Sequence, residues 1–282
     1  MMRVGFNSKL TSKNSKTKKR KNAVVFTKLL FISFVFLLLI GGIVGTVYGI
    51  KKWMKCCPYF YVSSVKVDGN KKISTIEILK LSGIKEGDNI FAINLQKVRN
   101  QILENPWIKD VSIERRLPDS IHIHINERTP LGLIQINQRI YMVDSTGTPF
   151  KPLLPEDSFS APIITGVETG KIAVSDVKNL NALIDHSKVA DALKIIKMSQ
   201  KGVRALGFNN ISQIYFPDDN TIVIYTADKA IPFYLDRNKL VKQFYRAEKI
   251  LIQLYNSGQY QKVLSVNVGY GKDMALAKLK SK

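Results

Sequence analysis

The chain has 282 residues, of which 43 are Lys or Arg and 22 are Asp or Glu, so its net charge is +21 at pH 7. A hydrophobic content of 45% excludes a mainly disordered chain, and two adjacent cysteines exclude a fold held by several disulfides. Three histidines and one Cys pair also exclude a zinc-cluster protein.

The first fifty residues predict a basic tail, residues 1–28, followed by a transmembrane helix, residues 29–50. They contain nine basic residues and no acidic residue, and residues 29–50 are uncharged. A helix of that length spans roughly 30 Å, which is the thickness of the hydrocarbon core of a bilayer. A cleaved signal peptide would have a shorter apolar segment and a cleavage site of small residues, so we expect an uncleaved anchor.

The charges on either side of the span predict its orientation. Nine basic residues precede or enter the span, whereas Lys51, Lys52 and Lys55 follow it closely. Because basic flanks stay in the cytoplasm, we expect a single-pass type II protein of the cytoplasmic (inner) membrane whose C-terminal part is extracytoplasmic. The basic run could instead contact nucleic acid. Because it lies next to an apolar span, a role in setting the topology and in contacting anionic lipid explains it better, so no nucleic-acid partner is expected.

Three glycines of the span recur at every fourth residue. Gly41, Gly45 and Gly49 therefore share one helix face. Small residues allow a second helix to approach closely, so this face is a candidate surface for transmembrane packing.

After a juxtamembrane linker at residues 51–58, residues 59–129 predict the order strand, helix, helix, strand, strand. The predicted elements are a strand at 62–68, a helix that begins at the capping-box residues Ser74 and Glu77, a helix that begins at Asn94, and a hairpin of residues 108–115 and 120–126. Gly69 and Asn70 are expected to form a turn with a positive φ. Trp107 is expected to anchor the second helix to the sheet.

Five short motifs follow one another along residues 69–130. They are Gly69-Asn70, Asn89-Ile90-Phe91, Pro106-Trp107, Arg115-Arg116-Leu117-Pro118-Asp119 and Glu127-Arg128-Thr129-Pro130. This ordered set of motifs follows a single predicted transmembrane helix. In this arrangement it resembles the POTRA domain of the bacterial cell-division family FtsQ/DivIB. Leu117 departs from that pattern, because many members have Trp there.

Residues 130–279 predict a second domain of mixed strands and helices. Strands are expected at 131–136, at 140–144 and around Ile211, Ile222 and Phe233, with a loop at 151–161. Helices are expected at 176–200, with a break near residues 185–187, and from the cap Asp236 to Gly258. A last hairpin of residues 263–268 and 274–278 ends the domain. The fold class is therefore α+β, with an N-terminal transmembrane helix, a POTRA-like β-α-α-β-β domain and an FtsQ-type β domain.

The final strand is the main candidate for binding a partner. If Met274, Ala275, Leu276 and Ala277 form the edge of a sheet, their backbone groups could pair with a strand of another protein, although nearby lysines could equally keep the edge solitary. The resemblance favours pairing, because the C-terminal domain of this family recruits the coiled-coil proteins FtsB and FtsL at its last strand. By position, Tyr270 matches the family's Tyr after the preceding strand.

The resemblance also implies the cellular role. It implies a non-enzymatic scaffold of the division septum that links early to late division proteins and contacts other divisome membrane proteins through the POTRA domain and the transmembrane helix. It implies no cofactor. Two alternatives remain open, a membrane-anchored cell-wall hydrolase or transferase, and a POTRA protein that works with an outer-membrane barrel.

Several residue patterns could suggest chemistry, but their context argues against it. Ser63-x-x-Lys66 and Ser265-x-Asn267 resemble penicillin-binding motifs without the Lys-Thr-Gly strand, and Gly166 to Lys171 lacks the P-loop spacing. His122 and His124 share one strand face but lack an evident third metal ligand, and His186 has no obvious Ser or Cys partner. Asp218-Asp219-Asn220 is expected to be a turn. Cys56 and Cys57 are expected to pack beside the membrane, so no catalytic or metal site is predicted.

Overall fold

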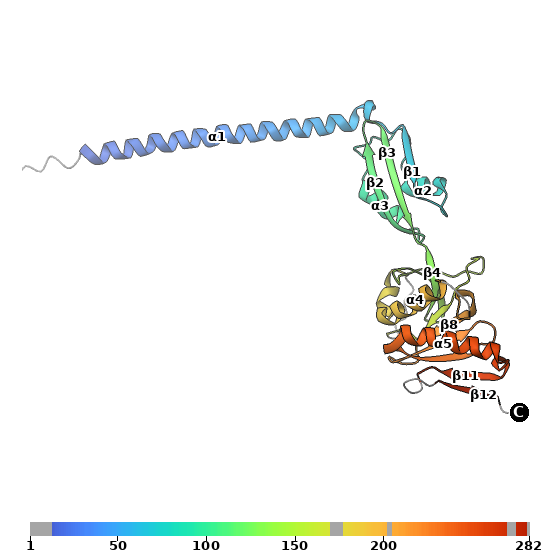
Figure 1. The fold of residues 1–282 in the computed structure, drawn as a ribbon. Coiled ribbons are helices and arrows are strands. Elements are labelled where there is room, and N and C mark those ends of the chain that lie inside the picture. Colours follow the sequence, from blue (N-terminus) through green and yellow to red (C-terminus); the bar gives the residue numbers. More distant parts are fainter. Residues whose placement is uncertain (1–12, 170–176, 202–204, 270–274, 281–282) are drawn as a thin grey trace, which may run out of the picture. The chain divides into compact units, whose positions relative to one another are not determined.

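The computed structural model describes residues 13–169, 177–201, 205–269 and 275–280, and the side chains from residue 28 onward except residue 30 (Figure 1). The chain divides into two compact units. The first unit comprises residues 1–66, 83–98 and 113–123, and the second comprises residues 67–82, 99–112 and 124–282.

The N-terminal part is one continuous helix, α1 (Lys13–Cys56). Its segment Phe31–Cys56 is long and apolar enough to cross a membrane. The most apolar stretch of this segment is not buried inside the protein. The predicted helix at 29–50 is therefore confirmed and continues beyond both ends. A Cβ atom added at Gly41, Gly45 or Gly49 would meet nothing within 4 Å, so this face of α1 is open.

A small sheet follows, with strand order β1-β3-β2. The elements are η1 (Pro58–Phe60), β1 (Ser64–Asp68), α2 (Thr75–Ser82), α3 (Leu95–Ile102), β2 (Ile108–Arg116) and β3 (Ser120–Glu127). The predicted order of strands and helices is confirmed, and so are the helix starts, because Ser74 Oγ accepts the N–H of Glu77 and Asn94 Oδ1 accepts the N–H of Lys97. Gly69 has a φ of +79°, and a Cβ there would lie 2.1 Å from the carbonyl oxygen of Ile125.

The second sheet has nine strands in the order β12-β11-β10-β9-β8-β7-β4-β5-β6. Its strands are β4 (Pro130–Ile136), β5 (Arg139–Asp144), β6 (Pro149–Pro152), β7 (Ile163–Thr165), β8 (Ile211–Tyr215), β9 (Thr221–Thr226), β10 (Pro232–Asp236), β11 (Val263–Asn267) and β12 (Leu276–Leu279). The pairs β4/β7, β7/β8 and β10/β11 are parallel and the remaining pairs are antiparallel. The sheet is therefore mixed, as predicted.

The helical elements that accompany the large sheet include one predicted cap and one predicted break. The helical elements are η2 (Val177–Leu183), α4 (His186–Gln200), η3 (Phe208–Asn210), η4 (Arg237–Lys239), α5 (Leu240–Asn256) and η5 (Tyr260–Lys262). Asp185 Oδ1 accepts the N–H groups of Ser187 and Lys188, so the expected break between η2 and α4 is confirmed. Asp236 accepts the N–H of Asn238 and starts η4, which leads directly into α5.

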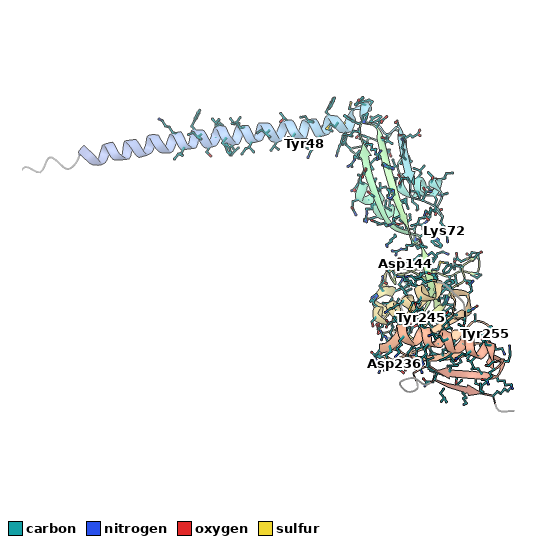
Figure 2. All side chains as sticks on the ribbon, in the orientation of Figure 1. Tyr48, Lys72, Asp144, Asp236, Tyr245 and Tyr255 are labelled. Atoms are coloured by element: carbon teal, nitrogen blue, oxygen red, sulfur yellow. The ribbon has the colours of Figure 1, made fainter. Side chains whose placement is uncertain are left out.

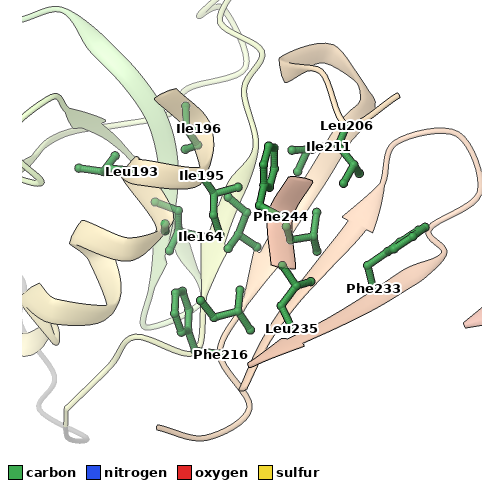
Figure 3. Packing of buried hydrophobic residues seen from close by; sticks show 14 of the residues in the cluster. Ile164, Leu193, Ile195, Ile196, Leu206, Ile211, Phe216, Phe233, Leu235 and Phe244 are labelled. Carbon is green, nitrogen blue, oxygen red and sulfur yellow. The ribbon is translucent and has the colours of Figure 1, made fainter. Parts of the chain in front are cut away.

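Helices α4 and α5 pack on one face of the large sheet and bury its main core (Figure 3). Phe244 of α5 and Phe233 of β10 are 2% and 0% exposed, and Ile164 of β7 is fully buried. The opposite face carries a smaller cluster of Leu133, Met142 and Phe150. Because residues alternate between the two faces, the period-two pattern of these strands places one set of side chains under the helices.

Two predicted boundaries were wrong and one strand was not predicted. The predicted loop at 151–161 begins inside β6, the strand β7 was not foreseen, and the last strand begins at Leu276 instead of Met274. The three-residue β7 lies between β4 and β8, and such a short central strand shows no alternation of polar and apolar residues.

Trp107 also differs from expectation, since its ring packs against Phe150 of β6, with the centroids 5.5 Å apart. Its backbone carbonyl accepts the N–H of Arg128 at 2.7 Å. The guanidinium of Arg128 in turn pairs with the buried carboxylate of Asp144 at 2.6 Å. The Pro-Trp and Glu-Arg motifs thus stabilise the second unit through one connected set of contacts.

Glu127 of the same motif holds the loop before α2. Its carboxylate accepts the N–H groups of Lys71, Lys72 and Ile73 at 2.8 to 3.0 Å. Burial by itself would raise the pKa of Glu127, but these hydrogen bonds outweigh it and hold the pKa below its ordinary value of 4.5.

The lowered pKa predicts a dependence of stability on pH. Since the folded-state pKa lies below the unfolded value, the stabilisation by the Glu127 carboxylate is present above the unfolded pKa and lost as the pH falls through the folded pKa. Glu127→Gln is expected to lower the free energy of unfolding at pH 7 by about 1–3 kcal/mol. Denaturant unfolding of both proteins from pH 7 to pH 3 should show the difference shrinking, whereas a constant difference would contradict the prediction.

Candidate partner-binding edge of the large sheet

The last strand, β12, lies at the edge of the nine-stranded sheet (Figure 1). It pairs antiparallel with β11, with Ala277 opposite Val266 and Leu276 opposite Asn267. Among the strands that the structure describes, none lies on its other side. The backbone groups on that side are therefore open to pairing with another chain.

The hydrogen bonds show which residues of β12 point outward. The N–H of Lys280, just past the strand, donates to the carbonyl oxygen of Lys262 at 2.8 Å and so points toward β11. In an antiparallel pair, successive residues alternate in direction, so Lys278 also points inward. Ala277 and Leu279 then direct their N–H and C=O groups away from the sheet.

The neighbouring strands give the same assignment independently. The N–H of Val268 donates to the carbonyl oxygen of Tyr234 on β10 at 2.9 Å. The backbone of Val268 therefore faces β10, and that of Asn267 faces β12. Asn267 is the register partner of Leu276, so the backbone of Leu276 is engaged within the sheet and that of Ala277 is free for a partner.

The side chains of β12 form a mixed surface. Leu276 and Leu279 are 55% and 42% exposed, and Lys278 is exposed between them. Ala277 packs against the core under α5. A strand added here would meet two exposed leucines and one cation beside an open backbone ladder.

The predicted site residues are only partly described by the structure. Leu276 and Ala277 lie on β12 and Ala275 is exposed just before it, whereas Tyr270 and Met274 lie outside the described residues. Leu279 was not predicted to belong to the site. Leu279 lies two residues after the part-buried Ala277, so the two side chains share one face of the strand. This spacing could have identified Leu279.

The structure shows where the residues with a possible catalytic or metal-binding pattern lie. The Ser63 hydroxyl donates to the carboxylate of Asp119 at 2.6 Å, and His124 pairs with Asp68. Asp218 accepts the N–H groups of Asn220 and Thr221, which confirms the predicted turn. The other candidates have these places: Gly166 follows β7 with a φ of +74°, Lys171 lies outside the described residues, His186 opens α4, and Cys56 and Cys57 are free thiols.

Among the side chains that the structure describes, no group of three or more His, Cys, Asp or Glu could hold a metal ion. A groove of about 660 Å³ lies over β7 and β8, lined by tyrosine, glutamine and threonine side chains and by Lys188 and Glu168. Lys188 pairs with Asp219 at 2.7 Å, and Glu168 accepts the N–H of Asn137 at 2.8 Å. The two charged groups that line the groove therefore already have partners within the second unit.

Comparison with known proteins finds a matching family for each of two segments of the chain. Residues 60–128 match the family described as POTRA domain, FtsQ-type, and residues 132–270 match the family described as Cell division protein FtsQ/DivIB, C-terminal.

Individual relatives extend over most of the chain. The cell division protein FtsQ of Syntrophotalea carbinolica is 26% identical over 249 residues, which cover 87% of this chain and 86% of the relative. FtsQ of Geotalea daltonii is 28% identical over 73% of this chain and 72% of its own length. The cell division protein DivIB of Clostridium tetani is 32% identical over 58% of this chain and 66% of its own length. Because these two family models match residues 60–128 and 132–270, the chain belongs to the FtsQ/DivIB family of cell-division proteins.

Proposed function

We propose that this division protein is a non-enzymatic scaffold that docks FtsB- and FtsL-like coiled-coil proteins by strand addition at β12. The observation that carries the proposal is the position of β12 at the edge of the sheet, with the backbone groups of Ala277 and Leu279 directed outward. Backbone pairing would supply affinity, and contacts with Leu276 and Leu279 would supply specificity. In this role the protein links early to late division proteins at the septum.

The N-terminal helix supports a membrane anchor. We assign residues 1–28 to a cytoplasmic tail, 29–50 to the membrane span, 51–58 to a linker, 59–129 to the POTRA domain and 130–279 to the β domain. The basic tail favours a type II orientation in the cytoplasmic membrane, with both folded domains extracytoplasmic. The POTRA domain and the open glycine face of α1 would then contact other divisome membrane proteins.

A photocrosslinking experiment tests the docking site. A photoreactive amino acid at Leu276, 55% exposed, is expected to form an adduct with the FtsB-like protein in dividing cells. The matched control is Ile76 on α2, an apolar side chain that is 78% exposed and lies outside the proposed site. Absence of the Leu276 adduct in cells where the labelled protein still supports division would overturn the proposal, as would an equal adduct at Ile76.

A further inference from the structure

The end of α1 lies close to the first residues of the folded region. The helix continues without interruption for six residues beyond Ile50, to Cys56, which is a rise of about 9 Å. The headgroup layer on each side of a bilayer is roughly 5–8 Å thick. If residues 29–50 span the membrane, as proposed above, the chain leaves α1 at the outer boundary of that layer.

Hydrogen bonds hold a loop of the first unit against the end of α1. The side-chain amide of Asn89, itself buried, donates to the backbone carbonyl of Met54 at 2.9 Å. The N–H of Ile90 donates to the carbonyl oxygen of Phe60 at 2.9 Å, and the rings of Phe60 and Phe91 meet edge to face at 5.1 Å. The loop is thereby fixed beside the last turn of the helix.

The turn between β2 and β3 reaches the same end of this unit. The N–H of Ser63 donates to the carbonyl oxygen of Asp119 at 2.8 Å. The guanidinium of Arg115 donates to the carbonyl oxygen of Ile90 at 2.8 Å. The turn at 117–119 is therefore connected both to the segment that follows α1 and to the loop that contacts it.

This end of the first unit exposes large apolar and aromatic side chains. Trp53, Tyr59 and Leu117 are 63%, 69% and 60% exposed, and Tyr61 is 39% exposed. Aromatic side chains of this kind are enriched at membrane–water interfaces, because an apolar ring and a polar tip suit the headgroup layer. An exposed leucine at the tip of a turn gains free energy from burial in the same layer.

The charges of the same end are compatible with a lipid surface. The segments 51–61, 84–93 and 114–119 contain six basic and four acidic residues. Two of the acids, Asp88 and Asp119, accept hydrogen bonds from Lys85 and Ser63 of the same unit. Anionic lipid attracts such basic flanks, so it should strengthen a contact that the apolar side chains make.

We propose that this end of the first unit is a second membrane contact, in which Leu117, Tyr59 and Tyr61 insert into the headgroup layer of the bilayer that anchors α1. The inference rests on the proposed membrane anchor and adds to it a peripheral lipid site on the POTRA domain. Such a contact holds the base of that domain against the membrane instead of leaving it on a free tether.

Site-directed spin labelling tests the inference. The full-length protein, with Cys56→Ser and Cys57→Ser, would carry one nitroxide at Leu117→Cys, Tyr59→Cys, Leu38→Cys or Thr129→Cys in vesicles of phosphatidylcholine and phosphatidylglycerol. Collision with oxygen reports lipid, and collision with a water-soluble nickel chelate reports solvent. We expect labels at 117 and 59 to favour oxygen more than the exposed control at 129, and less than the label at 38 within α1.

The outcomes separate this inference from the anchor itself. If the label at 38 lies in lipid while the labels at 117 and 59 match the one at 129, the lipid site is refuted and the anchor stands. If the label at 38 is accessible to the nickel chelate, both the anchor and the lipid site are refuted.

Discussion

Leu279→Pro is expected to weaken binding of an FtsB-like partner by at least about tenfold, or roughly 1.4 kcal/mol, while the protein stays folded. The N–H of Leu279 points away from β11, so a proline at this position removes a donor from the open edge and none from the ladder within the sheet. The proline ring also obstructs the carbonyl of an incoming strand. Edge strands tolerate proline on their solvent side, so the fold should persist.

A matched variant separates the backbone contribution from that of the side chain. Leu279→Thr removes the apolar contact but keeps the N–H and suits a strand. Partner affinity is measured with the full-length protein in nanodiscs, and circular dichroism checks that each variant is folded. If the proline variant is folded and binds as tightly as the original protein, strand addition at β12 is wrong. If both variants lose affinity equally, the side chain carries the binding instead of the backbone.

Phe244→Ala is expected to lower the free energy of unfolding by about 3–5 kcal/mol. Phe244 lies on the inner face of α5, is 2% exposed and packs in the main core of the large sheet (Figure 3), whereas the adjacent Tyr245 is exposed on the same helix (Figure 2). Truncation removes its buried ring and leaves a cavity that the surrounding isoleucine and leucine side chains fill only partly. Urea unfolding followed by tryptophan fluorescence measures the loss, since Trp107 packs against the other face of the same sheet.

The adjacent aromatic residue is the control. Tyr245 follows Phe244 on α5 but is 50% exposed. Tyr245→Ala should therefore change the free energy of unfolding by about 0.5 kcal/mol or less. Comparable losses for the two variants would show that α5 does not bury its inner face as described.

Many strands and helices of the second domain are evident from the sequence. Alternating apolar residues predict β4, β5 and β8 to β11, and the helical spacing of Leu240, Phe244 and Leu251 predicts α5. The cap Asp236 predicts where one helical segment begins, and residues 185–187 predict the break before α4. These features are local, since each depends on residues a few positions apart.

The charged residues of the Glu-Arg motif in the POTRA segment have partners that are distant in the sequence or lie in another strand. The Glu127 carboxylate binds three backbone N–H groups more than fifty residues earlier in the chain, and Arg128 pairs with Asp144 at the end of β5. No local pattern in the sequence indicates such partners. The family resemblance identified these residues, but only the contacts explain why they are charged.

The apolar helix, the α+β class, the order of most elements and the family resemblance are evident from the residues alone. The folded sheet shows in addition that β7 lies between β4 and β8, that β12 is an edge strand, and that Ala277 and Leu279 direct their backbone groups outward. A period of two tells which side chains share a face, because that depends on the backbone of one strand alone. The order of strands depends on pairing between residues far apart in the chain, and many pairings satisfy the same alternation, so only the packed sheet selects one.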